Sequence, residues 1–300
     1  MFNTVTIIGS INVDHILQIA RLPQPGETLA IQHATRAAGG KGANQAVAAA
    51  RSSAVVHFCG AVGTDDDGQF MLAQLQADGI DTTNIKPVTT TTTGQAYILL
   101  QADGENSILI QHGANEALVP ADVHLKPSTL VIAQLEVPQP VIAAAFARAQ
   151  AQQILTLLNP APAAAISPAV LAATDIIVPN ETESAALTGL AMQTPTDWQA
   201  NADWFHARGV KLVMLTLGAM GVYVSGLGHQ ELVPAFAAKV VDTTAAGDTF
   251  IGAFSAALKP DMGNLLAAVR YAEMASAQAI GHLGAQPSIP TRQAIEAALA

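Results

Sequence analysis

The chain has 300 residues, of which 50% are hydrophobic and 12% charged, so it can bury a large core and is not disordered. Its 23 acidic and 13 basic residues give a formal net charge of -10, and no Lys or Arg stripe is present to neutralise nucleic-acid phosphates. We therefore expect no nucleic-acid partner, and the single cysteine, Cys59, excludes an intrachain disulfide.

The N-terminal part of the chain alternates strand and helix patterns. Short apolar runs at residues 5–9 and 55–60 predict buried strands, and a helix between them begins near Gly42. A second helix is predicted over residues 69–77, ended by Gly79. The first run has neither the basic region nor the long apolar region of an export signal, and no segment has the pattern of a membrane span. We expect a cytoplasmic protein without a membrane partner.

Two segments interrupt this alternation. Residues 14–38 contain no good helix, and residues 94–112 have the pattern of two strands around Asp103 and Gly104. Both flank the first glycine-rich turns of the chain. We predict that they form a small β-sheet lid over whatever those turns bind.

The rest of the chain returns to alternating elements. Buried strands are predicted at residues 130–136, 154–159, 176–179 and 212–217, with a helix opening at Pro140. An antiparallel sheet edge at residues 221–224 and 231–233 precedes a helical C-terminal third. No linker separates two units. We predict an α/β fold, a doubly wound and mostly parallel sheet with helices on both faces and the small lid, in a single domain of residues 1–300.

The most informative motif is the run of residues 241–250, in which small residues precede an amphipathic helix. The free N–H groups of such a turn and the positive end of the helix dipole form an anion hole, and Asp248 can face the same point as a base. The alternative is an ordinary helix start in which Asp248 stabilises the first turn.

A second glycine turn, residues 38–45, also opens a helix. It is not a Walker A loop, and the chain has no dinucleotide-binding fingerprint, which disfavours a dehydrogenase. The alternative role of this turn is a tight connection between strand and helix. After the first strand, Asn12 and Asp14 have the i, i+2 spacing that places two polar groups on one face, which suits a polyol. Taken alone, Asp14 is also explained by an Asx turn in a loop.

Residues 180–183 follow a predicted strand at the sheet edge where α/β proteins bind ligands. The acidic groups there are able to hold Mg²⁺ through water, because this ion keeps several waters and needs only one or two carboxylates. Asn180 or Thr182 also has the position of a helix cap, and the two roles are compatible.

Together the motifs resemble the phosphofructokinase-B type carbohydrate kinases over nearly the whole chain. The resemblance is carried by residues 9–15, 39–50, 158–163, 179–183, 216–221, 242–250 and 284–288. It implies an ATP-dependent kinase that phosphorylates the 5-hydroxyl of D-ribose to give D-ribose 5-phosphate, with Mg²⁺, a K⁺ activator and a homodimer paired through the lid. Open alternatives are a kinase for 2-deoxyribose, fructose or a nucleoside, and a non-catalytic sugar-binding regulator on the same fold.

The resemblance also implies roles for individual residues. Ribose would contact Asn12, Asp14, Gly40, Lys41, Asn44, Glu136 and the base Asp248. ATP would contact Asn180, Glu183, Thr216, Gly218, Gly221 and Gly247, with the amides of Ala245, Ala246 and Gly247 at the transferred phosphate and Glu183 on Mg²⁺ through water. The monovalent cation would take Asp242, Thr244, Ala279, His282, Gly284 and Ser288, several of them through backbone oxygens.

Two positions depart from the family pattern. The family often has glycine where Ala245 stands, but alanine is tolerated there and does not imply inactivation. At Glu273 the family commonly has a histidine or another residue near the nucleotide, so an acid at this position is expected to weaken the contact with ATP.

Overall fold

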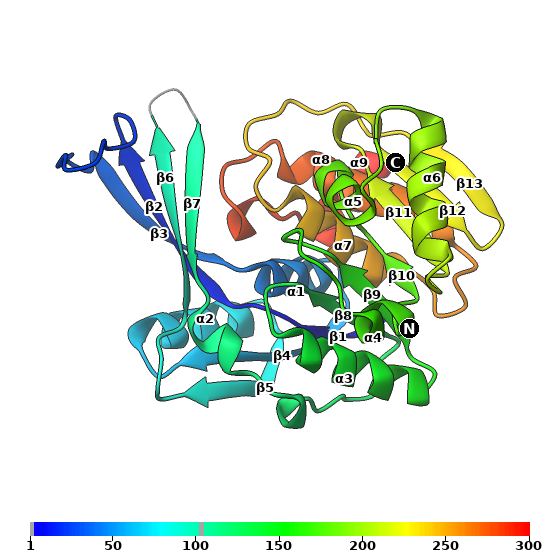
Figure 1. Ribbon diagram of the computed structural model, residues 1–300, viewed down its shortest axis with the longest axis horizontal. Coiled ribbons are helices and arrows are strands. Elements are labelled where there is room, and N and C mark those ends of the chain that lie inside the picture. Colours follow the sequence, from blue (N-terminus) through cyan, green and yellow to red (C-terminus); the bar gives the residue numbers. More distant parts are fainter. Residues whose placement is uncertain (1–2, 102–104) are drawn as a thin grey trace.

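A nine-stranded sheet forms the centre of the protein in the computed structural model, which describes residues 3–101 and 105–300 (Figure 1). The strand order is β13-β12-β11-β10-β9-β8-β1-β4-β5, and all pairs are parallel except those of β12 with β11 and β13. The strands are β1 Thr4–Ile8, β4 Val55–Gly63, β5 Asp81–Val88, β8 Leu130–Gln134, β9 Leu155–Asn159, β10 Ile176–Ile177, β11 Leu212–Thr216, β12 Val222–Gly226 and β13 His229–Val233. The mostly parallel sheet with an antiparallel edge is confirmed.

Helices cover both faces of this sheet, because successive strand residues point to opposite sides and both sides are apolar. Ile7 and Leu157 pack into one core with α1 Lys41–Arg51, α2 Asp66–Ala77, α7 Ala246–Ala257, α8 Leu265–Ala279 and α9 Arg292–Leu299. Their neighbours Ile8 and Leu158 pack into a second core with α3 Gln139–Ala151, α4 Pro168–Ala172, α5 Glu181–Thr188 and α6 Pro195–His206. The doubly wound prediction is confirmed.

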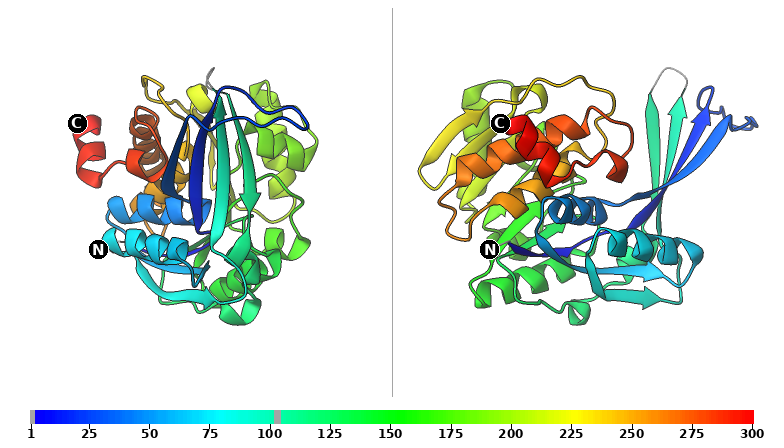
Figure 2. Two further views of the ribbon diagram at one scale, coloured as in Figure 1. Left: turned by 90° about the vertical axis from the view of Figure 1, so that its left-hand side faces the viewer. Right: turned by 180° about the vertical axis from the view of Figure 1, so that it is seen from behind.

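A second sheet of four strands forms the predicted lid. Its order is β3-β2-β6-β7, from β2 Asn12–Ile19, β3 His33–Gly39, β6 Gly94–Gln101 and β7 Asn106–Gln111. The lid stands away from the body in Figure 1 and in the rear view of Figure 2. The turn predicted around residues 103–104 lies outside the described residues.

Asp67 on α2 anchors the lid to the body. Its carboxylate lies 3.0 Å from Arg36 Nη1 on β3 and accepts a hydrogen bond from Gln95 Nε2 on β6 at 3.1 Å. The Arg36 guanidinium also lies 4.2 Å from the ring centre of Phe70 on the same helix. Two lid strands are thereby fastened to one helix of the main body.

The sheet order reverses beside β1, which pairs with β4 on one side and β8 on the other. In open α/β sheets, ligands bind in the crevice at the carboxyl ends of the strands at such a reversal. Ser10 follows β1 there, and Glu136 follows β8, and the Ser10 hydroxyl donates a hydrogen bond to the Glu136 carboxylate. The topology therefore points to a site at this place.

Three predictions about local structure need correction. The edge strand β5 was not predicted, and α2 begins at Asp66, three residues earlier than expected, because Asp65 caps it by accepting a hydrogen bond from the Gly68 N–H. Asp14 lies in β2, not in an Asx turn, since β2 begins soon after β1 and carries the chain into the lid.

In residues 3–101 and 105–300, no helix is long and apolar enough to cross a membrane.

Candidate active site

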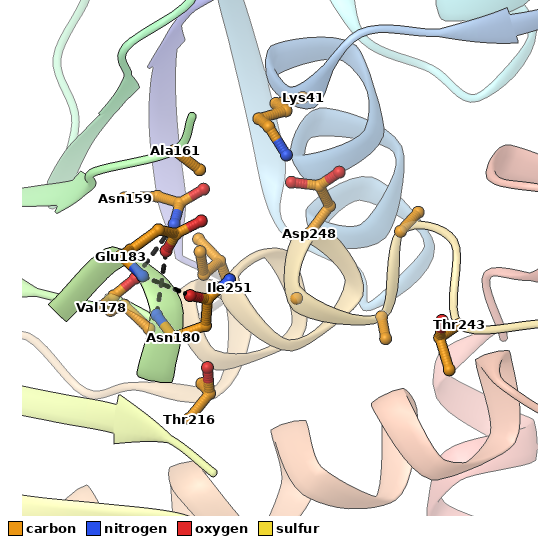
Figure 3. Close-up of a pocket in the computed structure, with 13 residues that line it drawn as sticks. Lys41, Asn159, Ala161, Val178, Asn180, Glu183, Thr216, Thr243, Asp248 and Ile251 are labelled. Atoms are coloured by element: carbon orange, nitrogen blue, oxygen red, sulfur yellow. Dashed lines mark hydrogen bonds between the residues drawn. The ribbon is translucent and has the colours of Figure 1, made fainter. Parts of the chain in front are cut away.

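A cavity of about 180 Å³ opens at the carboxyl ends of the central strands (Figure 3). Its walls come from the start of α1, from the segment between β9 and α5, from the end of β11 and from the turn before α7. They comprise Lys41, Asn159, Ala161, Val178, Asn180, Glu183, Thr216, Thr243, Ala245, Ala246, Gly247, Asp248 and Ile251. Eight residues with predicted roles therefore line one cavity, namely Lys41, Asn180, Glu183, Thr216, Ala245, Ala246, Gly247 and Asp248.

Asp248 lies in the first turn of α7 and is 7% exposed. Its hydrogen bonds cross to α1: Oδ1 accepts from Gln45 Nε2 at 3.0 Å and Oδ2 accepts from Asn44 Nδ2 at 3.1 Å. Neither bond satisfies a backbone N–H of its own helix. This geometry favours a held carboxylate over the helix-stabilising alternative.

The turn before α7 presents two free amides rather than three. Ala245 adopts a left-handed conformation with φ 60°, which explains why glycine also suits this position. The Ala246 N–H donates to the Thr243 carbonyl oxygen at 3.2 Å. Within the described part of the chain, the N–H groups of Ala245 and Gly247 have no acceptor. The Ala245 and Gly247 amides are therefore free to donate, and the role of all three amides at the phosphate stays a prediction.

Lys41 supplies a positive charge opposite the base. It is the first residue of α1, and its ammonium group points toward the Asp248 carboxylate (Figure 3). The charge of Asp248 is the main cause that raises the Lys41 pKa, and Glu136 and Glu183 add to it although burial acts in the opposite direction. Lys41 therefore remains a cation beside Asp248.

Two predicted sugar contacts, Asp14 and Glu136, are not among the residues that line this cavity, but Asp14 is coupled electrostatically to Glu136 and Asp248. Burial chiefly, and then the charges of Glu136 and Asp248, raise the pKa of Asp14 to about 7. A Cβ atom on Gly39 would lie 2.2 Å from Asp14 Oδ2, so glycine there makes room for the carboxylate. Glu136 is 7% exposed and accepts a hydrogen bond from the Lys41 N–H at 3.1 Å. Three carboxylates and one ammonium group thus lie close together.

Asn12 also lies on β2, and a hydrogen bond from Asn115 fixes the orientation of its side-chain amide. It is 4% exposed, and its Oδ1 accepts a hydrogen bond from Asn115 Nδ2 at 2.8 Å. Asn115 lies in the short helix η1 Gly113–Ala117 and also accepts from the Ile11 N–H at 2.9 Å. The Asn12 amide nitrogen therefore remains as a donor for a ligand. Gly40, the residue before α1, has φ 91°.

Asn180 and Glu183 cap α5 and line the cavity together, so the capping role of Asn180 is confirmed and the role in holding Mg²⁺ stays a prediction. Asn180 Oδ1 accepts from the Glu183 N–H at 2.7 Å, and Glu183 Oε2 accepts from the Asn180 N–H at 2.9 Å. Burial raises the pKa of Glu183, against the lowering effects of the Asn180 N–H and Lys41. The second carboxylate oxygen, Oε1, has no partner among the described residues, so this hard oxygen donor fits Mg²⁺ through water.

Gly218 and Gly221 lie outside the cavity lining, unlike Thr216. Gly218 belongs to the short helix η3 Gly218–Met220, and Gly221 follows it with φ 108°. A Cβ atom on Gly221 would lie 2.1 Å from the Val233 carbonyl oxygen. Close backbone packing accounts for this glycine, and its contact with ATP stays a prediction.

The family model described as pfkB family carbohydrate kinase matches residues 3–292. The chain belongs to this family. It is 43% identical to the ribokinase of Staphylococcus aureus (strain COL) over 296 residues, with 97% of each chain covered. It is 45% identical over 297 residues to the bifunctional ribokinase/ribose-5-phosphate isomerase A of Fructilactobacillus sanfranciscensis, covering 97% of this chain and 55% of that protein's length. The structure of Arabidopsis thaliana ribokinase complexed with ribose and ATP matches with a TM-score of 0.90 at 29% identity, covering 100% of this chain and 99% of that one.

The predicted cation loop of this pfkB family member lies beside the anion-hole turn. Asp242 Oδ1 accepts from the Thr244 N–H at 2.9 Å and hydroxyl at 2.6 Å, and Oδ2 accepts from the Gly284 N–H at 2.9 Å. Burial raises the Asp242 pKa, but these hydrogen bonds outweigh it and lower the pKa overall. The carboxylate therefore ties the turn to the segment after α8, and its ionised oxygens fit a monovalent cation.

The other predicted cation ligands are less clearly grouped. Ala279 is buried at the end of α8, His282 Nδ1 lies 3.1 Å from the Gln278 carbonyl oxygen, and the Ser288 hydroxyl donates to the Ala285 carbonyl oxygen at 2.7 Å. In the chain as described, no group of three or more His, Cys, Asp or Glu residues is arranged to hold a metal ion. Backbone carbonyl oxygens would have to supply part of the predicted site.

Sequence reasoning missed a set of buried amides behind the catalytic face of this kinase. Gln45, Asn159 and Gln134 are at most 7% exposed and are joined by hydrogen bonds. Asn159 had a detectable signal, because it ends a predicted strand at the ligand-binding edge of the sheet. Gln45 and Gln134 had none, since their partners lie 89 or more residues away in the sequence.

Proposed function

We propose that this protein is an ATP-dependent kinase that phosphorylates the 5-hydroxyl of D-ribose to give D-ribose 5-phosphate. The observation that carries the proposal is the position of Asp248, a buried carboxylate held beside two free amides and an ammonium group in a member of the pfkB carbohydrate kinase family. The similarity to ribokinases over nearly the whole chain supports ribose as the sugar.

In the proposed mechanism, the lid side binds the sugar through Asn12, Asp14 and Glu136. Hydroxyl groups donate to the carboxylates and accept from the Asn12 amide, and a sugar that lacks one of these hydroxyls leaves a buried polar group unpaired. The 5-hydroxyl is thereby directed toward Asp248. A primary alcohol is a poor nucleophile at neutral pH, and its oxygen becomes more acidic as phosphoryl transfer proceeds, so Asp248 accepts its proton.

The phosphoryl group meets the anion hole during transfer. The N–H groups of Ala245 and Gly247, the N-terminus of α7 and the Lys41 ammonium stabilise the charge on its oxygens. Mg²⁺ supplies neutralisation of the ATP phosphates when it is bound, and Glu183 would hold it through water. Asn180, Thr216, Gly218 and Gly221 are proposed for the nucleotide.

We also propose K⁺ activation, a cytoplasmic location and a homodimer. K⁺ activation is supported by the hydrogen-bonded loop of Asp242, Thr244 and Gly284, because a cation bound there would fix the turn that carries the anion hole. Three neighbouring residues of the lid edge strand, Ile108, Leu109 and Ile110, are 53%, 61% and 43% exposed, so a second lid packed against β7 would cover apolar surface. Residues 1–300 would act as one kinase unit.

A panel of sugars tests the proposal. Ribose, 2-deoxyribose, fructose and a nucleoside are each incubated with MgATP, and ADP release is measured together with the phosphorylated product. We expect kcat/KM to be highest for ribose. A preference for another sugar would contradict the proposed substrate, and binding of ribose without ADP release would favour the sugar-binding regulator.

A further inference from the structure

The carboxylate of Asp248 is held by an amide whose own hydrogen bonds are all used. Gln45 is fully buried on α1, and its Nε2 donates to Asp248 Oδ1 at 3.0 Å and to Asn159 Oδ1 at 3.1 Å. Its Oε1 accepts from Gln134 Nε2 at 2.6 Å. Gln45 therefore connects α1, α7, β8 and β9 through Asp248 and Asn159, which line the cavity, and through Gln134.

The direction of this amide is fixed by its neighbours. Asn159 Nδ2 donates to the Val178 carbonyl oxygen at 3.0 Å, so the Asn159 oxygen is the atom that faces Gln45 and requires a donor. Gln134 offers its nitrogen to the Gln45 oxygen. A Gln45 amide turned by 180° would place its oxygen against two other oxygens, those of Asp248 and Asn159, and its nitrogen against the Gln134 nitrogen. Only one orientation satisfies all three partners.

This arrangement matters because the carboxylate works among other charges. Lys41, Asp14, Glu136 and Glu183 are all coupled electrostatically to one another or to Asp248. Without the donor on Oδ1, only the Asn44 amide on Oδ2 would hold the carboxylate, and one hydrogen bond does not fix its plane. A donor on each oxygen holds the plane of the carboxylate.

We propose that Gln45 is a positioning residue that holds the Asp248 carboxylate in the orientation required to accept the sugar proton, and that Gln134 acts through Gln45 by fixing the direction of its amide. This inference rests on the proposed kinase function. It adds to that function two residues that contact neither the sugar nor ATP in the mechanism above.

The test is a double-mutant cycle between Gln45 and Asp248. Gln45→Met keeps the volume of the side chain and removes both donors, so we expect kcat to fall roughly 10- to 150-fold, the range for one lost hydrogen bond to a charged group. The KM values for ribose and ATP should stay within about threefold, because Gln45 touches neither. In an Asp248→Ala background, the same substitution should change the residual rate by less than about twofold.

Gln134→Met is the second variant. It leaves Gln45 in place and removes the group that orients it, so we expect a smaller fall in kcat of about 2- to 10-fold, the range for one neutral hydrogen bond. This fall should also disappear in the Asp248→Ala background. Gln134 reaches Asp248 only through its hydrogen bond to Gln45, so this variant tests the inference even if Gln45→Met folds poorly.

Asn201→Leu is the matched control. Asn201 is a fully buried amide on α6 that bonds to Ser184 and Thr188, remote from Asp248 in its hydrogen bonding. We expect a lower melting temperature with kcat within about twofold of the wild type. A kcat loss in this control as large as in Gln45→Met would identify a general effect of lost buried amides and overturn the inference.

Two other results would also overturn it. One is a Gln45→Met enzyme that keeps more than about a third of the wild-type kcat, and the other is an equal loss by Gln45→Met in the wild-type and Asp248→Ala backgrounds. Failure of the proposed function gives a different result, since the wild type itself would then not phosphorylate ribose. The cycle would in that case be measured with the sugar that the panel identifies, and a wild type inactive on every sugar would refute both proposals.

Discussion

The raised pKa of Asp14 predicts a pH-dependent cost to folding that Asp14→Asn removes. The folded-state pKa of about 7 exceeds the usual value of 3.8, chiefly because of burial and then because of Glu136 and Asp248. The sign follows from proton linkage: the cost is absent below the unfolded pKa, grows as the pH rises and is complete above about pH 7. Wild-type stability should therefore fall through this window.

The magnitude follows from the same values. Between pH 5 and the folded pKa of about 7, the free energy of unfolding of the wild type should fall by about 1.4 kcal/mol per pH unit through Asp14, or roughly 3 kcal/mol in total. Partial access of water to Asp14 lowers this estimate, so we expect a loss of about 1.5–3 kcal/mol by pH 8. The entropy of unfolding of a chain this long is roughly 0.6 kcal/mol per degree, so the expected change in melting temperature is about 2–5 °C.

The assay compares thermal unfolding of the wild type and Asp14→Asn without ligands at both pH values. The variant should gain about 2–5 °C on the wild type between pH 5 and pH 8, while its KM for ribose rises at least about tenfold through loss of a charged hydrogen-bond acceptor. ATP affinity should hardly change. A melting-temperature difference that is the same at both pH values would refute the placement of Asp14 among buried carboxylates.

Three further predictions concern the base, α8 and the cation loop. Asp248→Asn should lower kcat about 10²- to 10⁴-fold with near-normal ATP binding by calorimetry, and more than about a tenth of the wild-type kcat would contradict a role as base. Burial raises the Glu273 pKa to about 7, above its usual value of 4.5, so stability is lost as the pH rises to 7. Glu273→Gln should therefore gain about 1–3 kcal/mol in free energy of unfolding over the wild type between pH 5 and pH 8, and a stability difference from the wild type that is the same at both pH values would contradict this. K⁺ should raise kcat, and Na⁺ or Li⁺ should replace it poorly. Asp242→Asn should reduce the increase in kcat caused by K⁺, whereas equal kcat in K⁺ and in cation-free buffer would exclude the cation site.

The sheet and its helices were predictable because their signals are local. Buried parallel strands such as Leu155–Asn159 are continuous apolar runs, and a helix such as α7 has its own amphipathic pattern. The edge strand β5 was missed because it carries Asp81, Asn84 and Pro87, which are depleted in strands, and the proline is tolerated because the strand lies at an edge.

The candidate site was predictable at the residues that belong to motifs, and not at the residues that support them. Asp248 and Glu183 could be identified from the runs around them, and the cavity brings them together. Gln45, one of the two partners of Asp248, could not be identified, because it lies 203 residues away and meets Asp248 only after α1 packs against α7. The hydrogen bond from the Ala246 N–H to the Thr243 carbonyl oxygen was not predictable either. It depends on the left-handed conformation of Ala245, which the sequence does not indicate.

The most direct test of the proposed activity is to identify the product made from ribose and MgATP by the wild type and by Asp248→Asn. Phosphorus and carbon NMR of the reaction mixture locate the phosphate on the sugar. We predict that the wild type forms D-ribose 5-phosphate and that Asp248→Asn forms it about 10²- to 10⁴-fold more slowly under the same conditions. A wild type that leaves ribose unphosphorylated, or an Asp248→Asn enzyme that forms the same product at the wild-type rate, would contradict the account.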